Sequence, residues 1–247
     1  MRSGRTTLRS FYAWQNIEVG AGKHLLKAGR LLVANPKLTD PNFDRSVVML
    51  VAYGIEGALG LVLNRPSDMA VSTPLPQWAH FANEPAVLFL GGPVAHQAVI
   101  CLARSSLAGR GHPATPTWPS SQDPSSDPTE TPGIGRAIPG SQPTAGSDSG
   151  ALGAWKQFDG DLGTLDLEGD PDSFAGRIRA LRVFAGYAGW AAGQLEGEIE
   201  SGAWWVLDAA PDDAFSPAPD TLWKRVLLRQ PEPLRLIAFY PDNPVWN

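Results

Sequence analysis

Two acids, an arginine and a hydroxyl stand close together in the segment Asp40–Ser46 (DPNFDRS), just before an apolar stretch. Carboxylates can act as general acids or bases, and an arginine can bind an anionic group through paired hydrogen bonds. Asp44 and Arg45 are therefore candidates for an anion-binding or catalytic site. The same segment also suits a turn, in which Asp40 and Asn42 bond to the backbone and Arg45 pairs with a local acid.

Glycines follow apolar stretches at two distant places, Val87–Val94 (VLFLGGPV) and Arg182–Gly202 (RVFAGYAGWAAGQLEGEIESG). Each stretch is expected to be a strand that ends at its glycines, and the two ends could face each other at the edge of the sheet, where open α/β sheets bind ligands. Tyr187 and Trp190 would then form walls of a pocket. Alternatively, the glycines let a strand and a helix pack closely while both aromatic rings fill the core.

These segments define the candidate ligand-binding residues, whereas no residue is assigned a catalytic role. The candidates are Asp44, Arg45, Asn64, Arg65, Gly91, Gly92, Tyr187, Gly189, Trp190 and Gln194. Neither glycine segment matches a dinucleotide fingerprint or a phosphate-binding loop, so no cofactor is expected. The four histidines are scattered and the single cysteine excludes a cysteine-rich site, so no metal is expected either.

The segment Ala191–Glu200 is expected to be a helix with an acidic face. Glu196 and Glu200 stand four residues apart, which favours a solvated face or a contact for a basic partner over a pair of catalytic acids. Cys101 lies in an apolar stretch (AVICLA) and is expected to be buried and inert.

Composition limits the classes of function. A net charge of −5 argues against broad nucleic-acid binding, and no apolar run is long enough to cross a membrane. One cysteine and no secretory signal favour a cytoplasmic location.

Residues 1–27 are expected to be a flexible basic tail. A Pro-, Ser- and Thr-rich stretch at about 105–150 is expected to be a disordered insertion in the domain at 28–247, with a linker between two domains as the alternative.

The remaining chain alternates strand-like and helix-like patterns. Expected strands are Leu31–Ala34, Ser46–Tyr53, Ala58–Asn64, Val87–Leu90, Ala98–Ala103, Leu162–Leu167, Arg182–Ala185 and Ala203–Asp208. The second and third should form a hairpin around Gly54–Gly57. Helices are expected at Thr73–Ala82, from Asp170, at Ala191–Glu200, and from Asp220. The helix from Asp170 should have Ile178 and Leu181 on its apolar face. Leu234–Tyr240 should be a final strand or extended tail. The pattern predicts an α+β or mixed α/β domain with helices around a mixed sheet.

Four blocks of the chain resemble the YqgE/AlgH family of bacterial proteins: GRLLVANPKLTDPNFDRSVVML (29–50), GALGLVLNRP (57–66), LGGPV (90–94) and GYAGWAAGQLEGEIESGAWW (186–205). The resemblance implies one α+β domain with a branched or barrel-like mixed sheet surrounded by helices. It implies no established activity, although some members carry the label of transcriptional regulator. The chain departs from the usual pattern at Tyr53, where many members have histidine, at Leu102-Ala103, where Leu-His is common, and in its long insertion.

The leading hypothesis is a non-catalytic cytoplasmic protein that binds a small ligand or a protein partner, with a regulatory role. The first alternative is an enzyme with a polar site around Asp44 and Arg45. The second is a transcriptional regulator that binds DNA, which the absence of a helix-turn-helix pattern disfavours.

Overall fold

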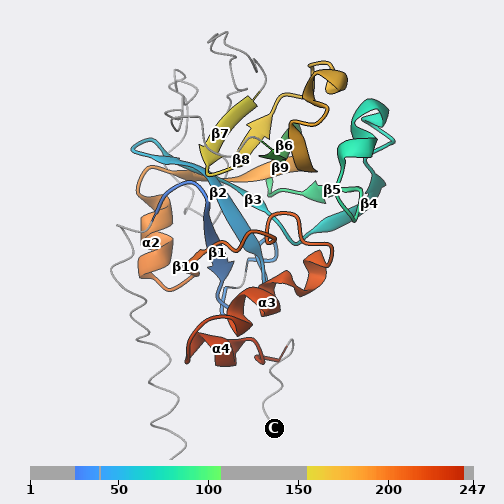
Figure 1. The fold of residues 1–247 in the computed structure, drawn as a ribbon. Coiled ribbons are helices and arrows are strands. Elements are labelled where there is room, and N and C mark those ends of the chain that lie inside the picture. Colours follow the sequence, from blue (N-terminus) through green and yellow to red (C-terminus); the bar gives the residue numbers. More distant parts are fainter. Residues whose placement is uncertain (1–25, 39, 107–154, 242–247) are drawn as a thin grey trace, which may run out of the picture.

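The computed structural model describes residues 26–38, 40–106 and 155–241 (Figure 1). The basic tail expected at residues 1–27 and the insertion expected at about 105–150 lie almost entirely outside these ranges. The strands are β1 (Arg30–Ala34), β2 (Val47–Gly54), β3 (Gly57–Val62), β4 (Pro66–Ala70), β5 (Val87–Leu90), β6 (Val94–Ser105), β7 (Trp155–Asp159), β8 (Leu162–Leu165), β9 (Ile178–Ala191) and β10 (Trp204–Asp208). The helices are η3 (Pro76–Phe81), η4 (Pro171–Phe174), α2 (Gln194–Glu200), η5 (Pro219–Thr221), α3 (Leu222–Leu228) and α4 (Leu234–Ile237).

One curled sheet of ten strands forms the framework. Its main order is β10-β1-β2-β3-β9-β6-β8-β7, and β5 lies between β9 and β4. Every pair is antiparallel except β5 with β9, so the expected mixed sheet is confirmed. One edge of β9 pairs with β6, while its other edge pairs first with β5 and then with β3. The sheet therefore divides at β9.

Three clusters of buried side chains cover the sheet. The first cluster joins one face of β1–β3 and β9 to α3 and α4, and the second joins the opposite face to α2. The third lies where β5, β6, β8 and β9 meet η3 and η4. Alternation along the strands explains the division: in β1, Leu31 and Val33 belong to the first cluster, whereas Leu32 and Ala34 belong to the second.

Several expected elements are present. The hairpin of β2 and β3 forms as expected, with Gly54 paired to Gly57. The side chains of α3 that were expected to face inward are buried, and Trp223 also donates from its indole nitrogen to the carbonyl of Ala34 at 2.9 Å. The indole bond ties α3 to the end of β1.

The expectation that a strand ends at Gly186 is wrong. β9 continues through the glycines to Ala191, and the helix begins at Gln194 rather than at Ala191. The turn is made instead by Gly193, whose φ of 77° is readily adopted only by glycine. The glycines of β9 are therefore residues inside a strand, where glycine commonly marks close approach of another backbone.

One expected helix and one expected strand also need correction. The helix expected from Asp170 is only the short η4, and both Ile178 and Leu181 lie in β9. Asp170 does cap η4 by accepting from the amide of Asp172, but Gly176, with a φ of 71°, turns the chain before a second helical turn forms. The segment Leu234–Tyr240 is not a strand, because α4 occupies its first half.

The domain is richer in sheet than expected. Strands β4 and β7 were not expected, and α2, α3 and α4 are short. In the described residues a few short helices pack against a large curled sheet (Figure 1), so the expectation of a sheet surrounded by helices is not confirmed.

Candidate functional site

The turn before β2 is fixed by Asn64, which follows β3. The side-chain oxygen of Asn64 accepts from the amide of Val47 at 2.9 Å, and its side-chain nitrogen donates to the carbonyl of Arg45 at 2.9 Å. Arg45 has a φ of 48°, in the left-handed region that is costly for a residue with a Cβ. The amide clamp stabilises this conformation and thereby sets the direction of the Arg45 side chain.

Both arginines of the predicted site donate to main-chain carbonyls. Arg45 donates to the carbonyls of Tyr240 at 3.0 Å and Pro241 at 2.7 Å, and its guanidinium lies 5.0 Å from the ring centre of Trp223. Arg65 donates to the carbonyls of Pro41 at 3.2 Å and Asp44 at 3.0 Å. The Asp44 side chain itself is exposed.

The two glycine segments meet, and they do so backbone to backbone. A Cβ placed on Gly91 would lie 2.2 Å from the carbonyl oxygen of Gly186, and one placed on Gly92 would lie 2.3 Å from the carbonyl carbon of Tyr187. No real Cβ tolerates such distances, so these positions require glycine. Tyr187 is half-buried, and burial raises the pKa of its phenol.

The arginine turn and the glycine contact adjoin each other. The amide of Leu90 donates to the carbonyl of Arg65, and the amide of Val62 donates to the carbonyl of Gly91, both at 2.8 Å. The chain thus places Asn64 and Arg65 beside the point where the sheet divides. Gly189 lies further along β9, paired with Leu59 of β3.

Replacing Gly91 by alanine should lower the free energy of unfolding by about 2–3 kcal/mol, because the methyl group cannot enter without moving two backbones. Urea denaturation measures the loss. Gly197→Ala is the matched control: a Cβ there meets nothing within 4 Å, and alanine should stabilise the exposed helix position by up to about 1 kcal/mol. Equal losses at both positions would contradict the close-packing role of Gly91.

Trp190 and Gln194 form a third group around Glu198, one of the acids of the expected helix. Glu198 is buried, so it does not belong to the solvated face or partner contact that was expected for the acids of this helix. One carboxylate oxygen accepts from the indole nitrogens of Trp190 at 2.9 Å and Trp204 at 2.8 Å. The other accepts from the side-chain amide of Gln194 at 2.9 Å. Trp190 is fully buried and packs on Phe43.

Tyr53 ties the β2–β3 hairpin to α2. Its hydroxyl donates to the Glu196 carboxylate at 2.7 Å, and this bond, with burial, raises the pKa of Tyr53 to about 12. Because this pKa lies above the value of the unfolded chain, the stabilising contribution is present below pH 10 and is lost as pH rises from 10 to 12.

A spectrophotometric titration should therefore show one tyrosine that ionises near pH 12 and that Tyr53→Phe removes. Glu196→Gln should move its midpoint towards 10, because the acceptor charge is gone. A titration that Glu196→Gln leaves unchanged would exclude the hydrogen bond as the cause.

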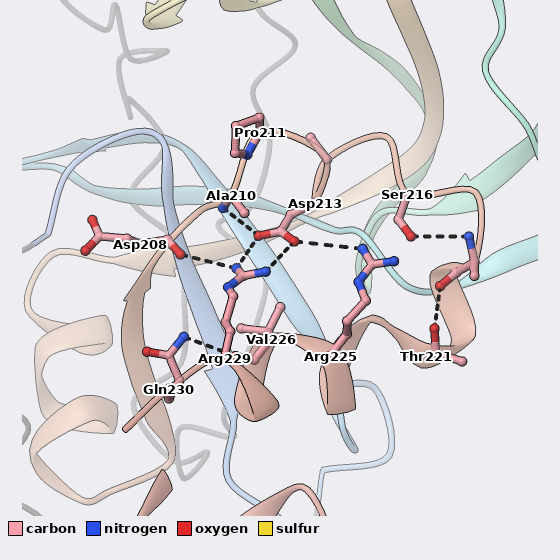
Figure 2. Close-up of polar contacts among 12 residues, drawn as sticks. Asp208, Ala210, Pro211, Asp213, Ser216, Thr221, Arg225, Val226, Arg229 and Gln230 are labelled. Carbon is pink, nitrogen blue, oxygen red and sulfur yellow. Dashed lines mark hydrogen bonds and ion pairs between the residues drawn. The ribbon is translucent and has the colours of Figure 1, made fainter. Parts of the chain in front are cut away.

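Arginine side chains also hold the loop between β10 and α3 through hydrogen bonds and ion pairs. Asp213, which is buried, accepts from both terminal nitrogens of Arg229, one of them at 2.8 Å, and Arg225 approaches it to 3.9 Å (Figure 2). On the sheet side, Arg182 of β9 is buried and donates to the carbonyls of Ala214 at 3.0 Å and Ser216 at 2.9 Å. These contacts fix the loop; no local sequence pattern revealed them.

Three other features considered from the sequence are a reactive cysteine, a metal site and a membrane span. Cys101 is buried, and burial raises the pKa of its thiol, as expected for an inert cysteine. Within residues 26–38, 40–106 and 155–241, no three His, Cys, Asp or Glu side chains gather as metal ligands would. No helix in the same ranges has the length and apolar character needed to span a bilayer.

An exposed apolar strip borders the dividing point of the sheet. Leu90 and Val99 lie on either side of Ala185 in β9, because both are paired with it. They are 45% and 49% exposed. Alternation places Val99 on the same face as Cys101, which belongs to the third cluster, so the strip continues this cluster into solvent.

Met69, on the neighbouring strand β4, is a further exposed apolar side chain. It is 49% exposed and lies two residues before Val71, a member of the third cluster. β4 pairs with β5, the strand that carries Leu90. We call Met69, Leu90 and Val99 the strand strip.

Comparison with known proteins identifies the family. A family model described as AlgH-like matches residues 31–129 and 142–235, so the chain belongs to the AlgH-like family and the resemblance noted in the sequence is confirmed. A UPF0301 protein of Streptomyces avermitilis is 42% identical over 219 residues, covering 89% of this chain and 94% of that protein. A UPF0301 protein of Mycobacteroides abscessus is 39% identical over 218 residues, covering 88% and 86%.

Solved structures agree with the fold. A crystal structure of a protein from Corynebacterium diphtheriae matches with a TM-score of 0.66 and 27% identity, covering 87% of this chain and 93% of that one. The solution structure of the AlgH protein from Pseudomonas aeruginosa matches with a TM-score of 0.53 and 24% identity, covering 91% and 98%. The second likeness concerns the fold alone.

Proposed function

We propose that this protein is a non-catalytic cytoplasmic binding protein that receives a protein partner on the strand strip. The observation that carries the proposal is the exposure of Leu90 and Val99 on one face of the sheet, with Met69 also exposed on the adjoining strand β4, next to the predicted site. Adjoining exposed apolar side chains on a folded surface are typical of protein contacts. A regulatory role would then act through occupation of this surface.

The rigidity of the strip supports this function. Leu90 immediately precedes Gly91, whose backbone contacts Gly186, and its amide bonds to the carbonyl of Arg65. A surface held in its binding conformation loses less conformational entropy when a partner associates. The glycines and Arg65 of the predicted site thereby acquire a role: they hold the strand from which Leu90 projects.

Binding of a small ligand near Arg45, Arg65 and Tyr187 is the alternative form of the proposal. The half-buried side chains of these three residues favour it, but the carbonyls that Arg45 and Arg65 contact would compete with a ligand. Catalysis by Asp44 and Arg45 is not supported, because the Asp44 carboxylate is exposed and the Arg45 guanidinium is hydrogen-bonded to main-chain carbonyls. DNA binding by α3 is weakened because Asp213 offsets charge from Arg225 and Arg229.

Native mass spectrometry of the chain purified from its own cells tests the proposal. The chain should retain a second protein, and Leu90→Asp should lose it while keeping the same circular dichroism spectrum. Lys156→Asp, an exposed change on β7, is the control and should retain the partner. A retained small molecule would instead favour the ligand site, and a bare chain would contradict both forms.

A further inference from the structure

The strand β6 has a free edge beside Val99, one residue of the strand strip. The amide of Ser105 donates to the carbonyl of Asp161, so alternate residues of β6, counted back from Ser105, direct their amides and carbonyls towards β8. β8 ends at Leu165, which pairs with Cys101, two residues after Val99. Among the described residues, no strand therefore lies beside the outward-facing amide and carbonyl of Val99.

The hydrogen bonds on the other side of β9 support this direction. The amide of Gly91 donates to the carbonyl of Ala185 at 2.9 Å, so Ala185 directs its main-chain groups towards β5 rather than towards β6. Val99 pairs with Ala185, and the two residues of an antiparallel pair either exchange both hydrogen bonds or neither. The main-chain groups of Val99 therefore point away from β9.

The chain after β8 turns away from this edge. The side chain of Asp166 accepts from the amide of Glu168 at 2.9 Å, and the carbonyl of Leu167 accepts from the indole nitrogen of Trp78 at 3.1 Å. Leu167 thereby packs on the third cluster instead of extending β8 along β6.

The segment that turns away is acidic. Residues 166–177, which join β8 to β9, contain one base, Arg177, and four exposed acids: Asp166, Glu168, Asp170 and Asp172. Three nearby bases lie elsewhere. Arg104 and Arg179 contact Asp161 at the other end of β8. Lys156 pairs with Thr164, which pairs with Leu102, so alternation places Lys156 on the opposite face of the sheet from Val99.

We infer that the edge of β6 at Val99 adds an extended, basic segment of a partner protein as a further strand. The inference rests on the proposed function, because Val99 belongs to the strand strip. The backbone of the segment would bond to the amide and carbonyl of Val99, and its apolar side chains would cover the exposed side of Val99. Basic residues of the segment would meet the acids of residues 166–177.

An extended protein segment fits this edge better than a helix or a nucleic acid does. An extended backbone presents a donor and an acceptor together, which the amide and carbonyl of Val99 require, whereas a helix bonds its own main-chain groups. His96 and Gln97, which precede Val99, are exposed and leave room for the segment to continue. The four acids would repel the phosphates of a nucleic acid or of an anionic membrane.

Hydrogen exchange of the full chain, followed by NMR, tests the inference with a capped peptide of alternating valine and threonine that has a lysine at each end. In the free chain the amide of Val99 should exchange at least about tenfold faster than those of Ile100 and Leu102. Binding of the peptide should saturate and slow the exchange of Val99 about tenfold or more.

Val99→Pro removes the outward N–H at a position where an edge strand tolerates proline, and should weaken peptide binding about tenfold or more. Its thermal unfolding midpoint should stay within about 5 °C of that of the unchanged protein. Val99→Ala, the matched control, keeps the N–H and should bind the peptide within about threefold of the unchanged protein.

Modified peptides test how the segment binds. N-methyl groups on the valines should abolish binding, because a valine opposite Val99 would direct its N–H at β6, whereas N-methyl groups on the threonines should leave binding unchanged. Glutamate in place of both lysines should weaken binding. The inference is overturned if the amide of Val99 is already protected in the free chain, if the peptide fails to saturate at about millimolar concentration, or if methylation of the valines has no effect.

Native mass spectrometry of the chain purified from its own cells separates this inference from the proposed function. Val99→Pro should lose the retained partner, as Leu90→Asp does. A partner that is kept by Val99→Pro but lost by Leu90→Asp would overturn strand addition and leave the proposed function standing.

Discussion

Replacing Arg182 by methionine is expected to lower the free energy of unfolding by about 3–4 kcal/mol, a large part of the stability of a typical domain. Arg182 is buried in β9 and donates to three main-chain carbonyls, those of Glu84 at 3.0 Å, Ala214 at 3.0 Å and Ser216 at 2.9 Å. Its guanidinium also lies 4.2 Å from the ring centre of Phe89. Burial lowers its pKa to about 10, which still leaves it protonated at neutral pH.

Methionine fills much of the same space but cannot donate a hydrogen bond, so three carbonyls lose their donor, and the bonds to those of Ala214 and Ser216 are buried. Urea denaturation at pH 7 measures the loss. Arg179→Met, on the same strand and exposed, removes only a surface ion pair with Asp161 and should cost less than about 1 kcal/mol. A similar small loss for both variants would show that Arg182 does not hold the loop to the sheet.

Replacing Glu198 by leucine should cost about 3 kcal/mol, because two indole N–H groups and an amide lose a charged acceptor in the core. Glu198→Gln keeps the shape and one acceptor, and should cost about half as much. Denaturant unfolding, followed through the tryptophans that contact this residue, reports both effects.

Glu56→Gln on the exposed end of the hairpin is the control for Glu198 and should change stability by less than about 0.5 kcal/mol. If Glu198→Leu were as stable as the unchanged protein, the carboxylate would not be what joins α2 to β9 and β10.

The parts of the fold that the sequence predicted depend on local patterns. The β2–β3 hairpin could be predicted because β-branched and apolar stretches flank Gly54 and Gly57. The inward side of α3 could be predicted from helical spacing, as at Trp223 and Leu227. In both cases the decisive residues are neighbours in the chain.

The parts that could not be predicted depend on distant contacts. Gly186 and Gly189 resembled a strand end, but β9 runs through them because β5 and β3 approach one of its edges in succession. The strand β4 consists mostly of polar and small residues (PSDMA) and forms through its pairing with β5. Tertiary pairing overrode local preference in both elements.

The candidate site, too, could be predicted from the sequence only in part. Asn64 and Arg65 were singled out from the sequence and do lie beside Gly91. The sequence did not show that Arg182 and Glu198 are buried, because their partners come from segments that only the fold brings together, and charged residues are expected at the surface.

Photo-crosslinking in the cells that make the protein tests partner binding at the strand strip most directly. A photoreactive phenylalanine analogue at Val99 should yield one adduct of defined protein mass, and adding Leu90→Asp should abolish it. The same group at the exposed Lys156 of β7 should yield no such adduct. Equal adducts at both positions, or none at Val99, would contradict a partner on this surface.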